Sequence, residues 1–139
     1  MIARSSQALR AGAGAGLLLC AVSPSAMADI YVIINSRLTI SAEDIKEIYT
    51  GEKQLAGSIK ITPLDNSAAK GEFLSKVLQL DGVRYEALWI KKSFRDGINP
   101  PVVKATDAEV IAIVRSTAGS IGYVSTVPPD GVTVLKKFQ

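Results

Sequence analysis

The sequence predicts a single α/β domain in which a small mixed sheet is covered by about four helices. Two continuous apolar runs, IYVII at residues 30–34 and IGYV at 121–124, are typical of strands buried on both faces. Between them lie several segments whose apolar residues recur at helical spacing, interrupted by short strand-like runs. This alternation predicts helices packed on a sheet.

Residues 1–28 have the features of a secretory signal peptide. Two arginines precede an apolar core at residues 11–22 that is too short to span a bilayer, and Ala26-Met27-Ala28 matches a cleavage site. We therefore expect cleavage before Asp29, one domain at residues 29–139, no membrane insertion afterwards, and a periplasmic location. An uncleaved membrane anchor is a weaker alternative. A lipid attached at Cys20 is also weaker, because a bulky leucine precedes that cysteine.

Composition excludes several classes of function. The whole chain has 16 Lys and Arg against 13 Asp and Glu; two of the arginines belong to the leader, which leaves 14 basic residues and a net charge near +1. There is no basic run longer than two residues, so nucleic acid is not expected as a partner. Histidine is absent and the one cysteine is in the leader, so we expect no metal site, disulfide or cofactor.

The first half of the domain predicts a strand, a helix and a second strand. After the run at 30–34, Ile45, Ile48 and Tyr49 form a helical stripe, with Asp44 in the capping-box position and Gly51 after the last turn. The alternating run at residues 59–62 then predicts a strand that ends at Pro63.

The second half predicts three helices and the remaining strands. One helix follows the turn at residues 65–67, and a second covers 83–94 with Tyr85, Leu88 and Trp89 on its buried face. A third begins at Thr106, which forms a T-x-x-E capping box with Glu109. Short strands are expected at residues 102–103, 121–124 and 132–135.

The candidate site lies where the central strand turns into its helix. If Ser67 caps that helix, Lys70 falls in the first turn, where a cation opposes the helix dipole. A bound anion held by Ser67, Lys70 and backbone amides would explain this position; so would a nearby carboxylate such as Glu72, or solvation. Asn66 belongs to the same turn.

Ser67 and Lys70 also form an S-x-x-K motif, the nucleophile pattern of penicillin-binding proteins and serine β-lactamases. The partner motifs S-D-N and K-T-G are missing, and 111 residues are too few for that fold. We therefore expect no catalytic residue and no enzymatic activity.

Residues 30–124 resemble one lobe of the phosphate-binding proteins of ABC importers, within the type II periplasmic binding proteins. The resemblance is carried by LTISAEDIKEIYTG at 38–51, by the strand–turn–helix with Asp65, Ser67 and Phe73, by YEALW at 85–89, and by AGSIGYV at 118–124. It implies a single lobe of that fold, with an oxyanion bound at the turn that includes Asp65, Asn66 and Ser67. Lys70 is our own candidate for a replacement positive charge and is not a feature of the family. Pro63 stands where the family's arginine is expected, and the second lobe is missing.

Two functions follow as hypotheses. The first is a periplasmic module that binds phosphate or a similar oxyanion in connection with phosphate uptake, with Asn35 and Ser36, at the end of the first strand, placed near the turn. Because it has only one lobe, its half-site would need a second protein surface to enclose the anion (the second wall of the site), from a homodimer or from an envelope or transporter protein. The second is a non-enzymatic envelope interaction module that has lost its ligand.

Overall fold

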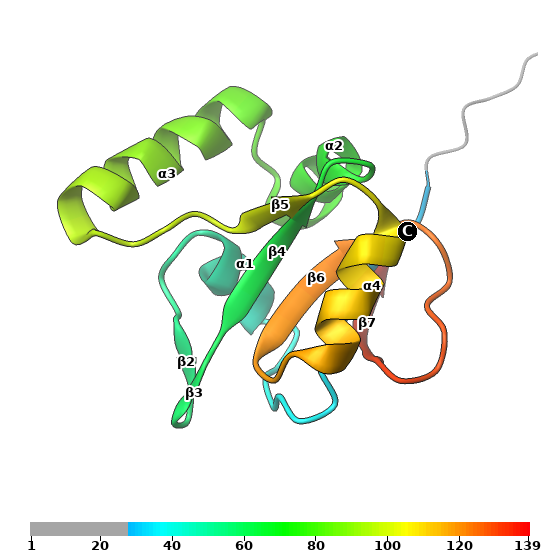
Figure 1. The fold of residues 1–139 in the computed structure, drawn as a ribbon. Coiled ribbons are helices and arrows are strands. Elements are labelled where there is room, and N and C mark those ends of the chain that lie inside the picture. Colours follow the sequence, from blue (N-terminus) through cyan, green and yellow to red (C-terminus); the bar gives the residue numbers. More distant parts are fainter. Residues whose placement is uncertain (1–27) are drawn as a thin grey trace, which may run out of the picture.

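The computed structural model describes residues 28–139, which form one five-stranded mixed sheet, a two-stranded hairpin and four α-helices (Figure 1). The order of the large sheet is β5-β4-β6-β1-β7, and its strands are β1 (Ile30–Ile34), β4 (Thr62–Asn66), β5 (Val102–Lys104), β6 (Ser120–Val124) and β7 (Thr133–Phe138). The hairpin pairs β2 (Leu55–Ala56) with β3 (Ile59–Lys60). The predicted fold class is confirmed. The predicted signal peptide, up to residue 27, lies outside the described residues.

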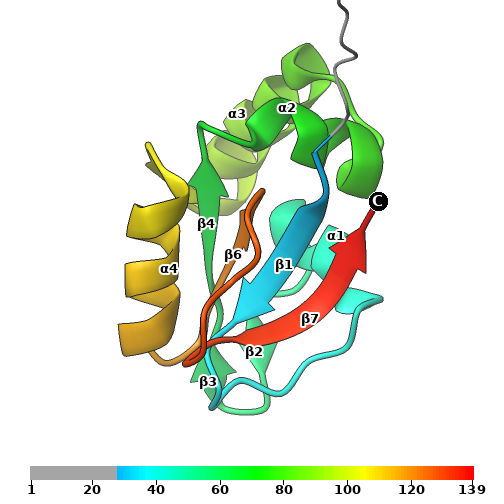
Figure 2. The same cartoon turned by 90° about the vertical axis from the view of Figure 1, so that its right-hand side faces the viewer.

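The direction of β1 decides which chain segments meet. β4 runs parallel to both β5 and β6, whereas β1 runs antiparallel to β6 and to β7. β1 and β4 therefore point in opposite directions, and their carboxyl ends lie at opposite edges of the sheet. Figure 2 shows the two arrowheads pointing away from each other.

The helices cover both faces of the sheet and divide the core in two. On one face lie α1 (Asp44–Tyr49), α2 (Lys70–Phe73) with the π-helical turn η2 (Leu74–Leu78) that continues it, and α3 (Gly82–Asp96). α4 (Asp107–Ser116) covers the other face (Figure 2). Among residues 28–139, no helix is both long and apolar enough to cross a bilayer.

Most local predictions are confirmed. Tyr85 and Trp89 are buried on α3, and Thr106 Oγ1 accepts the backbone N–H of Glu109 at the start of α4. Gly51 follows α1 with φ +81°, the left-handed conformation expected after a helix. Gly122 allows close packing, because an added Cβ would lie 2.5 Å from Val110 Cγ1.

The prediction for residues 61–67 was wrong. Pro63 lies inside β4 instead of ending a strand, and Asp65 and Asn66 are strand residues, not part of a turn. The proline is tolerated because β4 pairs with β6 at Thr62 and Pro63, whereas its pairing with β5 starts at Leu64. At Pro63, β4 is therefore paired on the β6 side alone. This part of the strand is an edge, where the missing N–H of proline costs little.

Candidate functional site

A buried carboxylate lies at the carboxyl end of β4. Asp65 is only 2% exposed, and each of its oxygens accepts a tyrosine hydroxyl: Tyr123 Oη donates to Oδ1 at 2.8 Å, and Tyr85 Oη donates to Oδ2 at 2.9 Å. Lys70 Nζ lies 4.0 Å from Oδ2. The charge of Asp65 is thus satisfied by two hydrogen bonds and one nearby cation from three different elements.

Burial sets the protonation of this cluster. Loss of solvation raises the pKa of Asp65 above its ordinary value, while the hydrogen bonds from Tyr123 and Tyr85 and the charge of Lys70 act to lower it. The pKa values of Tyr85 and Tyr123 are raised, first by burial and then by the neighbouring carboxylate. Both tyrosines therefore stay protonated at neutral pH and remain hydrogen-bond donors.

The side-chain nitrogen and oxygen of Asn66 are both hydrogen-bonded to other residues of the protein. Its Nδ2 donates to Asp107 Oδ1 at 2.7 Å and to the Tyr123 carbonyl at 2.9 Å, and its Oδ1 accepts the Ala68 N–H at 3.0 Å. This side chain links the end of β4 to the first residue of α4 and to β6. Because Asn66 is fully buried and its polar atoms are bonded, it shapes the turn and does not face a ligand.

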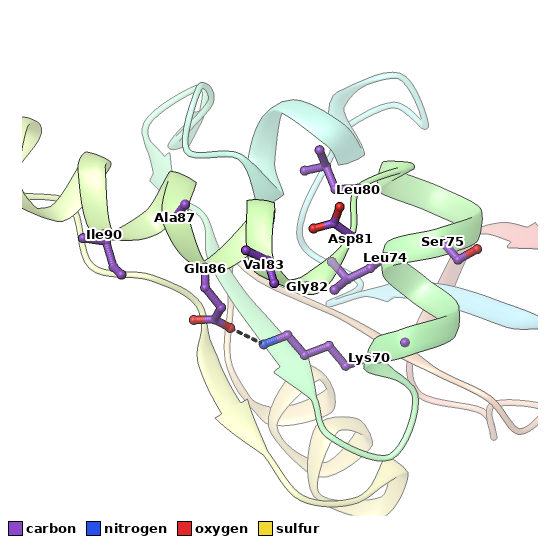
Figure 3. A pocket seen from close by; sticks show the side chains of 11 residues that line it. Lys70, Leu74, Ser75, Leu80, Asp81, Gly82, Val83, Glu86, Ala87 and Ile90 are labelled. Atoms are coloured by element: carbon purple, nitrogen blue, oxygen red, sulfur yellow. Dashed lines mark hydrogen bonds and ion pairs between the residues drawn. The ribbon is translucent and has the colours of Figure 1, made fainter.

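Lys70 is the first residue of α2, and its ammonium group lies at the protein surface between two carboxylates. Nζ lies 3.1 Å from Glu86 Oε2, in addition to its approach to Asp65, and 5.1 Å from the centre of the Tyr85 ring. Figure 3 shows the Lys70 and Glu86 side chains reaching toward each other between α2 and α3. The charge that opposes the helix dipole is thus offset by neighbouring carboxylates; Glu72, the candidate named from the sequence, pairs with Lys76 instead.

Ser67 does not cap the helix as predicted. It lies in the turn before α2, is exposed, and its N–H donates to the Lys104 carbonyl at 2.8 Å. The position before α2 is occupied by Ala69, which makes no side-chain cap. The turn is ordered instead by Asn66, whose side-chain and main-chain oxygens accept the next two free amides. Because α2 begins at Lys70, two residues later than predicted, Ser67 does not occupy its N-cap position.

The structure does not bring Asn35 and Ser36 to this turn, which corrects the sequence-based expectation. The Asn35 N–H bonds to the Ser120 carbonyl at the start of β6, whereas in β4 it is Thr62 that pairs with Ser120, so Asn66 lies four residues further along. Four residues of strand, about 13 Å at 3.3 Å each, separate the two levels. Asn35 is buried and donates to the Val114 carbonyl at the end of α4; Ser36 is exposed. The expectation failed because it assumed that β1 and β4 are parallel.

Sequence reasoning missed three members of the cluster. Tyr85 and Tyr123 were assigned to the apolar core because each shares its stripe or strand with aliphatic residues. Their hydroxyls were the available signal, since a buried tyrosine needs a hydrogen-bond partner and Asp65 is an acid in an apolar setting. Glu86 lies 16 residues from Lys70 and was not predictable from local spacing.

Comparison with models of protein families and with curated protein sequences gives no match. Three solved structures align with about four fifths of the chain. They are an ABC-type phosphate transport receptor from Vibrio cholerae (14% identity, TM-score 0.49), a phosphate ABC transporter substrate-binding protein from Clostridium perfringens with bound phosphate (19%, 0.49), and PstS from Borrelia burgdorferi (16%, 0.46).

These alignments cover 79%, 79% and 82% of this chain, and 47%, 46% and 58% of the three proteins. The chain thus spans about half the length of the solved proteins that it matches. The matched structures belong to the same group of proteins that the sequence motifs resemble.

Proposed function

We propose that residues 29–139 form a non-enzymatic periplasmic binding module, one lobe in extent, that holds phosphate or a similar oxyanion at the turn after β4. The observation that carries this proposal is the position of Lys70, whose partly exposed ammonium lies 4.0 Å from Asp65 Oδ2, three residues after the exposed Ser67 in the chain. The sequence motifs that resemble those of the phosphate-binding proteins include this same turn, through Asp65 and Ser67.

The candidate residues divide into two roles. Ser67 and Lys70 would contact the anion, through a hydroxyl and an ammonium group. Asp65 and Asn66 are buried, so in this proposal they position the turn without touching the ligand. Asn35 and Ser36 lie at the other edge of the sheet and are not part of the site.

An anion would have to compete with Glu86 for Lys70. The Glu86 side chain is 65% exposed and that of Lys70 is 26% exposed. Exposed ion pairs of this kind contribute about 0–1 kcal/mol, so releasing Lys70 from the glutamate costs little. Because the open half-site stays in contact with water, tight binding requires a second wall from another copy of the chain or from an envelope or transporter protein.

The alternative function, an interaction module without a ligand, is favoured by a different observation. The side-chain amides of Asn35 and Asn66 and both oxygens of Asp65 are occupied by internal hydrogen bonds. In this alternative the cluster only stabilises the fold, and the surface of the module recognises another protein.

Calorimetric titration of residues 29–139 with phosphate, and with sulfate as a control anion, separates these functions. Oligomeric state is measured by light scattering in the same buffer. Under the proposed function phosphate releases or absorbs heat, and Ser67→Ala and Lys70→Ala each weaken binding while the circular dichroism spectrum is retained. Phosphate binding that survives both substitutions, or no heat from either anion, rejects a site at this turn and leaves the alternative.

A further inference from the structure

Helix α3 is apolar on two opposite faces. One face packs on the core through Tyr85 and Trp89. The other carries Val83, Ala87, Ile90 and Phe94, and we call these four residues the outer stripe. Their exposed fractions are 81% for Val83, 63% for Ile90 and 91% for Phe94. Spacings of four, three and four residues align the outer stripe along one side of the helix.

A groove runs beside the outer stripe. It has a volume of about 960 Å³ and lies between α3 and the α2–η2 segment, with Leu74 and Leu80 opposite Val83, Ala87 and Ile90 (Figure 3). The Lys70–Glu86 ion pair lies within it. The groove therefore continues the apolar surface of the stripe onto a second element.

The flanks of the outer stripe carry different charges. At 100° per residue, Arg84, Lys91 and Arg95 follow the side of α3 that faces away from the groove. Glu86 lies on the groove side. Among residues 28–139, Arg84 and Arg95 pair only with acids of their own helix or its cap, at exposed positions where such pairs are weak. This basic flank remains available to an acidic partner.

We infer that the outer stripe and its groove dock an amphipathic helix of another protein, one whose apolar face is bordered on one side by Asp or Glu. A concave apolar surface suits a helix, whose side-chain ridge fills the groove, and the basic flank selects the acidic border. A flat bilayer would leave the groove unfilled. In a two-fold antiparallel pair of α3 helices, the two basic flanks would lie side by side, which disfavours that arrangement of a second copy. This docking does not require an anion at Lys70.

The test uses two synthetic 18-residue helical peptides with leucines at positions i, i+4, i+7 and i+11. One carries Glu along one flank and the other carries Lys at the same positions. We expect fluorescence anisotropy to show that residues 29–139 bind the Glu peptide at least tenfold more tightly than the Lys peptide. Ile90→Asp should weaken binding of the Glu peptide at least tenfold, whereas Val127→Asp, at a 76% exposed site off the helix, should not.

A charge reversal tests the flank. The double variant Arg84→Glu, Lys91→Glu should bind the Lys peptide more tightly than the Glu peptide. Equal binding of both peptides by the unmodified protein, or no binding of either, overturns the proposal. Binding to vesicles of anionic lipid without binding to the Glu peptide overturns it in favour of a membrane surface, and concentration-dependent dimerisation that Ile90→Asp abolishes overturns it in favour of a second copy.

Discussion

At the scale of single residues, the two hydroxyls that bond Asp65 are expected to contribute strongly to stability. Tyr85→Phe or Tyr123→Phe removes one donor from a buried carboxylate, which costs roughly 1.5–3 kcal/mol for a bond to a charged group. Tyr123→Phe should cost more, because that hydroxyl also accepts the Asn66 N–H. Urea unfolding measures both. Tyr31→Phe, at a partly exposed ring, is the matched control, and an equal loss there would contradict the assignment.

Asp65 also predicts a dependence of stability on pH. Its folded pKa is raised above the unfolded value, so between these two values the folded state holds the proton more tightly than the unfolded state does. The contribution of Asp65 to the free energy of unfolding therefore increases as the pH falls through the folded pKa, and is complete below the unfolded one.

Comparison with Asp65→Asn isolates this contribution from the other carboxylates. The free energy of unfolding of the unmodified protein minus that of the variant should increase as the pH is lowered from 7 to 4. A difference that falls over this range would show that the tyrosines and Lys70 outweigh burial.

Glu86 is expected to compete with the anion. Glu86→Gln releases Lys70 from its 3.1 Å ion pair, so the affinity for phosphate should rise by up to about fivefold, the equivalent of about 1 kcal/mol. Calorimetric titration checks this, with Glu52→Gln as the control because Glu52 pairs with a different lysine, Lys92, away from the turn. If the phosphate affinity of Glu86→Gln is unchanged, phosphate does not bind beside Lys70.

At the scale of elements, the junction between α4 and β6 leaves no room for a side chain at Gly119. Gly119 has φ +83°, and a Cβ there would lie 2.3 Å from the Lys60 carbonyl oxygen. Gly57 has φ +63° with no atom within 4 Å of the added carbon. Gly57→Ala should therefore cost about 1–2 kcal/mol for the left-handed backbone alone, and Gly119→Ala clearly more. Equal losses of stability in the two variants, measured by thermal unfolding, would show that the β3 strand moves aside.

An element could be predicted when the residues that determine it lie close together in the sequence. The apolar face of α3 and the capped start of α4 depend on residues within one helix, and both were predicted. β4 was cut short because Pro63 normally ends a strand, and only the register of β5 explains its position. The predicted Ser67 cap is missing because α2 begins at Lys70, so that Ala69 occupies the N-cap position.

At the scale of the whole molecule, the two halves of the core should unfold together. The cluster on the α1, α2 and α3 face and the cluster on the α4 face share β1 and β6, since neighbouring residues of these strands point to opposite faces. Near-ultraviolet circular dichroism, which senses Trp89 on one face, and far-ultraviolet circular dichroism should give one coincident transition. Separate transitions would mean that α4 unfolds independently.

The candidate site shows the limit of sequence reasoning at this scale. Asp65 and Lys70 are five residues apart, and their proximity was predictable. The separation of Asn35 from that turn depends on the direction of β1, which its own residues do not encode. That direction follows from pairings with residues 120–124 and 133–138, nearly a hundred positions away.

The interior position of β1 has a consequence for how the chain acquires its structure during synthesis. Within residues 28–139, Ile30–Ile34 is the first strand to be synthesised, yet its two hydrogen-bonding neighbours, β6 and β7, are the last two strands of this range. Contacts between such distant segments form slowly, because a long loop must close first. The nascent polypeptide therefore lacks the pairings of β1 until residues 120–138 have been synthesised.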